Sequence, residues 1–125
     1  TPCIHSDDLS DFAAVVYLGD NLHSENGTSF YQHIQSGLKI LPNATQMSKL
    51  SKKKINMLKY YEKNHLWKEG EPPQFNKWKK YYECKNIFNR AIIFNSKRFH
   101  CAEKGYGDNK YNSRFFQTFF FNIDN

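Results

Sequence analysis

The sequence predicts a mainly β domain of the sandwich or barrel class, interrupted by one Lys-rich helical insertion. Three observations support this prediction. The chain has 125 residues, which is room for one domain spanning residues 1–125. Aromatic residues make up 17% of the chain, an excess that suits strands. Short apolar or aromatic runs alternate with Gly, Asn and Pro turn signals along most of its length.

Several short runs have the composition of β-strands. They are residues 12–18, 28–34, 38–41, 78–84, 91–94 and 114–121. In residues 78–84 the side chains alternate in part, which places Trp78, Tyr82 and Cys84 on one side. Residues 114–121 contain five Phe and have the strongest β propensity, so we expect this strand to lie in the core.

The positive charge of the chain is concentrated in one segment. The formal net charge is +6, yet residues 49–85 alone hold 11 Lys and four acidic residues, and the remainder is close to neutral. Met47 and Leu50 begin a helical apolar spacing, with Asn43 or Thr45 as its N-cap. We therefore predict a helical insertion over residues 43–77. Its surface is a solvated helix face or a contact for an anionic partner such as nucleic acid.

Composition also predicts where the chain resides. The longest apolar run, residues 12–18, is too short to cross a membrane. Three Cys are too few, and odd in number, for a disulfide framework. No secretory leader is visible. We expect a cytoplasmic protein in a reducing compartment, with no membrane partner.

The residues with the clearest chemical potential are His5, Asp7 and His100. In an extended segment, residues two apart share a face, so His5 and Asp7 can bind one metal ion. A pair of ligands is a weak signal, because such a pair is commonly just a hydrogen-bonded turn. His100 follows a predicted buried strand and a polar turn, where a third ligand can stand. Fourteen residues later, Arg114 opens the last strand on the same face as Thr118.

This order of residues resembles the Fe(II)- and 2-oxoglutarate-dependent oxygenases, in particular the prolyl-hydroxylase-like branch. That superfamily has an H-x-D motif, a later His, and an Arg or Lys about ten to fifteen residues beyond it. Further similar segments are residues 13–18 after the H-x-D motif, residues 27–30 as a Gly-Thr-x-Phe turn, and residues 89–94 before the distal His. The similarity runs from about residue 3 to residue 121, interrupted by the insertion.

The resemblance implies a double-stranded β-helix, or jelly roll. It also implies Fe(II) held by His5, Asp7 and His100, with 2-oxoglutarate and dioxygen as cosubstrates. Arg114 would hold the far carboxylate of 2-oxoglutarate, and Thr118 would donate a second hydrogen bond. The implied reaction is hydroxylation of a C–H bond in an unidentified substrate, with release of succinate and CO2.

The sequence departs from the family pattern at its start, because only four residues precede His5. We expect a jelly roll that lacks its N-terminal elements, as a piece of a longer protein or a reduced form that associates with itself.

Two other functions stay open. One is a non-enzymatic jelly roll whose basic insertion binds an anionic partner, and the other is a metal enzyme without 2-oxoglutarate. At residue level, Arg114 could instead pair with Asp108, and Tyr17 and Tyr31 could simply pack in the core.

Overall fold

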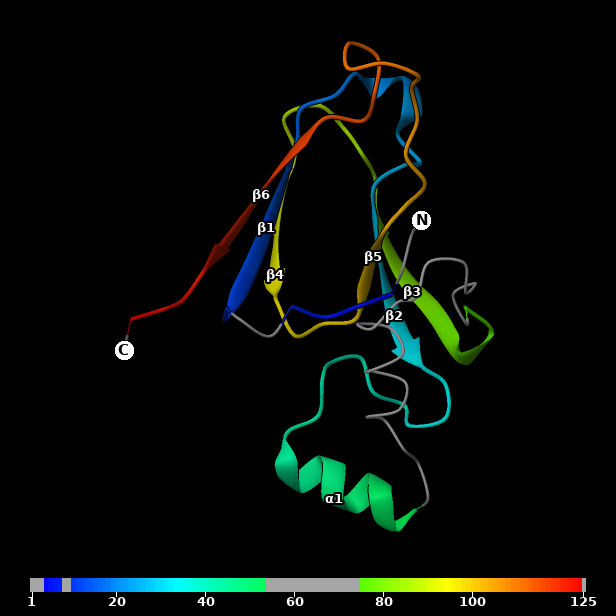
Figure 1. Ribbon diagram of the computed structural model, residues 1–125, viewed down its shortest axis with the longest axis vertical. Helices are drawn as coiled ribbons and strands as arrows, with labels where there is room; N and C mark the ends of the chain where they lie inside the picture. The colour runs from blue at the N-terminus through cyan, green and yellow to red at the C-terminus, as the bar shows by residue number, and fades with distance from the viewer. Residues whose placement is uncertain (1–3, 8–9, 54–74, 125) are drawn as a thin grey trace.

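The computed structural model describes residues 4–7, 10–53 and 75–124, and these carry six strands and one α-helix (Figure 1). The strands are β1 (Phe12–Tyr17), β2 (Thr28–His33), β3 (Trp78–Cys84), β4 (Ala91–Asn95), β5 (His100–Ala102) and β6 (Phe116–Phe121). The helix is α1 (Ala44–Lys52), and two short 3-10 turns span Asn21–His23 and Phe75–Lys77. The prediction of a mainly β fold is confirmed.

The strands form two antiparallel sheets that face each other (Figure 1). One sheet has the order β4-β1-β6 and the other has the order β3-β2-β5. A bridge between His5 and His100 adds the segment around His5 beside β5. Within the described part of the chain, the two sheets share no strand, so they make a layered pair and not a closed barrel.

Two buried clusters hold the sheets in place. The first lies between the sheets and joins Val15 and Tyr17 of β1 to Phe30 of β2 and Phe94 of β4. The second lies on the other side of the β3-β2-β5 sheet, because successive residues of β2 point to opposite faces. Its buried members are Ile4, Tyr31, Trp78, Phe99 and Cys101. Met47 and Leu50 of α1 pack against this second cluster, and the helix lies beyond the ends of the strands (Figure 1).

The alternation predicted for residues 78–84 is broken by a β-bulge. Phe30 pairs with Tyr82, but the next residue of β2 pairs with Lys80, so Tyr81 is the extra residue. Cys84 is buried in the first cluster, on the face of β3 that it shares with Tyr82, whereas Trp78 is buried in the second cluster on the opposite face. The prediction that Trp78 shares a side with Tyr82 and Cys84 is therefore wrong, since one inserted residue reverses the faces beyond it.

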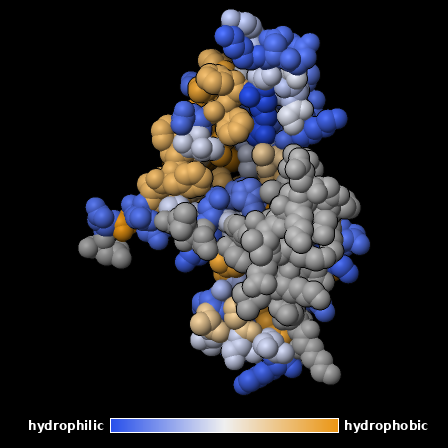
Figure 2. Space-filling model, viewed as in Figure 1, coloured by the Kyte–Doolittle hydropathy of each residue, from blue (hydrophilic) through white to orange (hydrophobic). Residues whose placement is uncertain are grey.

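The prediction that the Phe-rich last strand lies in the core is also wrong. Every residue of β6 is exposed, including Phe119 at 51% and Phe120 at 57%. The reason is its place in the sheet: β6 pairs with β1 and ends the order β4-β1-β6. Figure 2 shows a continuous hydrophobic surface on this side of the molecule. Composition predicted the strand correctly and its burial incorrectly.

The insertion is described only at its two ends. Asn43 is the N-cap of α1 and forms a capping box with Gln46, which confirms one of the two predicted caps. Residues 54–74, with most of the predicted Lys-rich surface, lie outside the described residues.

Residues 38–41 were expected to be a strand, but they carry a single bridge, from Ile40 to Arg98. No described helix combines the length and apolar character needed to cross a membrane.

Candidate metal centre

His5, Asp7 and His100 converge at one point, as predicted. One possible ligand atom from each residue lies within 4.8 Å of the others. The Oδ2 atom of Asp7 is 3.3 Å from Nε2 of His100, and its Oδ1 atom is 3.8 Å from Nε2 of His5. Two atoms that each bind one ion at about 2.1 Å cannot be more than about 4.2 Å apart. Both separations from Asp7 are below that limit, and the three side chains form a group that could hold one divalent ion.

Main-chain pairing explains why these three residues meet. The amide of His5 donates to the carbonyl of His100 at 2.9 Å, and the amide of His100 donates back at 2.9 Å. Two residues on, the amide of Asp7 donates to the carbonyl of Ser96 at 2.8 Å. Because the segment is extended between these anchors, His5 and Asp7 turn the same face toward His100.

The imidazole of His100 is buried and held in one orientation. Its Nδ1 atom is 2.8 Å from the carbonyl oxygen of Arg98. A carbonyl only accepts hydrogen bonds, so Nδ1 carries a proton, and Nε2 faces Asp7 as the ring atom that can bind a metal ion. The ring is further packed against Phe94, with the centroids 4.8 Å apart at 63°, and against Phe30 at 6.3 Å.

A cavity of about 170 Å³ adjoins the three residues and contains both predicted cosubstrate-binding residues. Arg114 and Thr118 line it, together with Thr28, and strand β1 supplies an apolar wall. The structure therefore brings together all five residues that the sequence singled out. Thr28 was not predicted, although it lies in the Gly-Thr-x-Phe segment that carried part of the resemblance.

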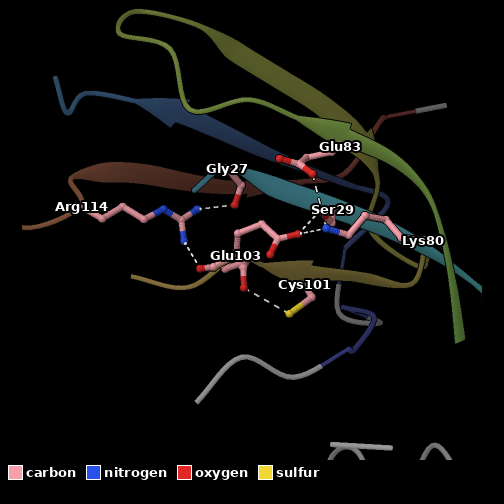
Figure 3. Close-up of polar contacts among 8 residues, drawn as sticks. Gly27, Ser29, Lys80, Glu83, Cys101, Glu103 and Arg114 are labelled. Atoms are coloured by element: carbon pink, nitrogen blue, oxygen red, sulfur yellow. Dashed lines mark hydrogen bonds and ion pairs between the residues drawn. The ribbon is translucent and has the colours of Figure 1, made fainter. Parts of the chain in front are cut away.

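Arg114 is held by the backbone and not by an acidic side chain. Its guanidinium donates to the carbonyl of Gly27 at 3.0 Å and to the carbonyl of Glu103 at 3.2 Å (Figure 3). Its Nε atom is buried without a hydrogen-bond partner among the described residues, and burial lowers the pKa of the guanidinium. No described ion pair joins Arg114 to Asp108, which instead contacts Asn112. The charge of Arg114 is thus not neutralised by a described acid.

Gly27 makes the Arg114 contact possible. A side chain at this position would bring a Cβ atom to 1.8 Å from the carbonyl oxygen of Cys84. The absence of a side chain lets the Gly27 backbone approach β3 closely and present its carbonyl to Arg114. The role of this glycine was not predicted, although a Gly before a strand pattern is a known signal of close backbone approach.

A polar network next to this arginine ties three strands together (Figure 3). The carboxylate of Glu103 accepts hydrogen bonds from Ser29 of β2 and from Lys80 of β3, the latter at 2.5 Å. Lys80 also lies 3.4 Å from Glu83. Glu103 directly follows β5, and its backbone carbonyl accepts a hydrogen bond from Arg114. The network therefore fixes the backbone that holds the guanidinium. Sequence patterns offered no signal for it.

The two tyrosines behave as packing residues. Tyr17 is fully buried, and its hydroxyl donates to Thr28 Oγ1 at 2.7 Å. Burial raises the pKa of the Tyr17 phenol to about 12, so it stays protonated at neutral pH. Tyr31 is buried in the second cluster. Tyr17 still affects the site indirectly, because it orients Thr28 at the cavity wall.

Comparison with known proteins identifies a family and nothing more specific. The model of the family of unknown function DUF6445 matches residues 1–109. That range contains the three converging residues and ends before Arg114. No curated protein and no solved structure matches the chain.

Proposed function

The chain belongs to the DUF6445 family, whose function is unknown, and we propose that it is an Fe(II)- and 2-oxoglutarate-dependent oxygenase that hydroxylates a C–H bond. The observation that carries this proposal is the cavity in which a His-Asp-His cluster and a buried arginine face a common space. Neither feature alone selects this chemistry. Together, the cluster could bind a metal ion and the arginine could bind a carboxylate in the same cavity.

The ligand chemistry supports iron over softer alternatives. Two neutral imidazoles and one carboxylate form a facial set that leaves further coordination positions open, as non-haem Fe(II) oxygenases require. The buried cysteines Cys84 and Cys101 do not belong to the described His-Asp-His group. A closed structural zinc site would need a fourth protein ligand, and no fourth His, Cys, Asp or Glu joins this group within the described residues.

The chain path supports a jelly-roll arrangement. A jelly roll is a pair of antiparallel sheets between which the chain passes back and forth. Here β1, β4 and β6 belong to one sheet, while β2, β3 and β5 belong to the other. The segment bearing His5 extends the second sheet beside β5. The metal ligands then lie at the strand ends near the space between the sheets, where a reactant can be enclosed.

When bound, Fe(II) would supply oxidative decarboxylation of 2-oxoglutarate to succinate and CO2. The residues of the chain prepare the site for it. The Arg98 carbonyl fixes His100 as a ligand through Nε2. Arg114 lines the cavity and its guanidinium would hold the far carboxylate of 2-oxoglutarate, and Thr118 lines the same cavity. Ala13, Ala14 and Val15 of β1 give the cavity an apolar wall.

The proposal is tested by equilibrium binding of 2-oxoglutarate to the chain loaded with Mn(II), a redox-inert substitute for Fe(II). Because Arg114 supplies the charge for the far carboxylate, Arg114→Gln should weaken 2-oxoglutarate binding about tenfold or more. Mn(II) binding itself should be unchanged in this variant. With Fe(II) and oxygen, the wild-type chain should convert 2-oxoglutarate to succinate, and the variant should do so poorly.

Arg90→Gln is the matched control, because Arg90 is exposed and its described contact is the carbonyl of Lys85. It should bind 2-oxoglutarate like the wild type. Metal binding without any affinity for 2-oxoglutarate would refute the oxygenase assignment. It would favour a metal enzyme that uses another reactant.

A further inference from the structure

A second concave surface shares the residue Phe94 with the cavity at the metal centre. It has a volume of about 420 Å³ and lies between β3 and β4, which are edge strands of different sheets. We call it the β3–β4 groove, and its walls are built mainly from Tyr81, Tyr82, Ile92 and Phe94. Its size is in the range that small-molecule sites occupy.

One aromatic residue, Phe94, connects the groove to the metal centre. Phe94 lines both the groove and the cavity that holds the three ligands. The Phe94 ring meets the ring of His100 edge to face, with the centroids 4.8 Å apart. Phe30, also in the groove wall, is 5.0 Å from Phe94. A molecule in the groove would therefore lie outside the arginine cavity, with the Phe94 ring between it and His100.

The groove is apolar except for a positively charged end. Arg98 lines it and is half-buried, and its guanidinium donates to the hydroxyl of Tyr81 at 3.3 Å. The Nζ atom of Lys39 lies 4.5 Å from the centroid of the same tyrosine ring. Within the part of the chain that the structure describes, no carboxylate pairs with Arg98. A guanidinium with only a neutral side-chain partner is suited to an anionic ligand.

Resting on the proposed function, we infer that the β3–β4 groove binds the substrate, and that the substrate is a carboxylic acid with an aromatic or branched apolar body. The body would pack against Phe94 and Ile92, and the carboxylate would pair with Arg98. A singly charged carboxylate suits this largely apolar groove better than a doubly charged phosphate, because it loses less hydration on entry. The β-bulge matters here, since the extra residue Tyr81 supplies the hydroxyl that orients Arg98.

The inference is tested first without metal, so that it does not depend on catalysis. The probes are 2-naphthylacetate and 2-naphthylacetamide, which share an apolar body and differ in charge. Calorimetry should show the acid binding about tenfold more tightly than the amide. Arg98→Gln should abolish this preference, while Arg90→Gln should retain it. Equal affinity for acid and amide in the wild type, or a preference unchanged in Arg98→Gln, would overturn the inference.

A second measurement places the probe relative to the metal centre. In Mn(II)-loaded protein, the paramagnetic ion should broaden the naphthyl proton resonances of the bound acid. Asp7→Ala should remove this broadening and leave the acid-over-amide preference intact. Absence of broadening in a protein shown to bind both Mn(II) and the acid would overturn the assignment as a substrate site.

The two proposals fail in different ways. A chain that prefers the acid but binds neither Mn(II) nor 2-oxoglutarate would refute the oxygenase function, and with it the substrate role of the groove. A chain that binds Mn(II) and 2-oxoglutarate but shows no acid preference would refute the groove inference alone.

Discussion

The Nδ1 atom of His100 lies 2.8 Å from the carbonyl oxygen of Arg98, two residues earlier in the chain. This contact fixes the tautomer of the imidazole and aims Nε2 at Asp7, 3.3 Å away. The Arg98 side chain extends from the same residue into the β3–β4 groove. Arg98 would thus have two roles. Its backbone carbonyl orients the metal ligand His100, and its side chain would bind the carboxylate of the proposed substrate.

Replacement of a ligand should remove metal binding. We expect His100→Ala to weaken Mn(II) or Co(II) binding by at least about a hundredfold, since losing a direct ligand costs more than losing an outer hydrogen-bond partner. His23→Ala is the control, because His23 stacks on Tyr106 and is not part of the cluster. Titration of Co(II) by absorption spectroscopy measures both. Unchanged affinity in His100→Ala would refute the ligand assignment.

Gly27 should be the least replaceable glycine near the site. Gly27→Ala should lower the free energy of unfolding by about 3 kcal/mol, because its new Cβ would overlap the Cys84 carbonyl. Gly105→Ala is a matched control, since nothing lies within 4 Å of the Cβ that it would add. Urea denaturation of both variants measures the difference. Equal stability of the two variants would contradict the close approach of Gly27 to β3.

Glu103 should contribute a pH-dependent part of the stability. Burial alone would raise the pKa of its carboxyl, but hydrogen bonds from Lys80 and Ser29 outweigh burial, and the net pKa is lowered. A carboxyl with a lowered folded-state pKa stabilises the protein above its unfolded-state pKa, and the effect is lost as pH falls through the folded-state value.

Glu103→Gln should therefore be less stable than the wild type by about 0.5–1 kcal/mol at pH 7, a modest effect because Lys80 is partly exposed to solvent. The difference should shrink in acid, below the ordinary range of a glutamate pKa. Unfolding free energies across this pH range test it, with the exposed Glu25→Gln as the control. A difference that does not change with pH would contradict the proposed cause.

The exposed aromatic surface of β6 should promote self-association. An edge strand that presents apolar side chains and unpaired backbone groups is a site for pairing with another chain. Phe119→Lys should lower the average mass seen by sedimentation at high protein concentration, because it places charge on this surface. Tyr111→Lys, at an aromatic residue that is even more exposed but lies outside the strands, should have no effect. A wild-type chain that stays monomeric at all concentrations would contradict this prediction.

The metal cluster was predictable because its signal is local. His5 and Asp7 are two residues apart in an extended segment, and the period of a strand places such residues on one face. His100 could be chosen because it follows a recognisable strand and turn. The groove was not predictable, since it depends on which strands become edges and on a bulge at Tyr81 that moves one hydroxyl to the other face.

The sequence by itself determined the mainly β class, the positions of five of the six strands, two candidate caps of which Asn43 is the real one, and the residues able to bind a metal. These follow from side-chain period, turn residues and capping chemistry, which act over a few residues. Only the tertiary structure decided that β6 lies at an edge with its phenylalanines exposed, and that Arg114 is held by the carbonyls of Gly27 and Glu103. Those outcomes depend on contacts between residues far apart in the chain, 87 positions in the case of Arg114 and Gly27, and composition carries no record of such pairings.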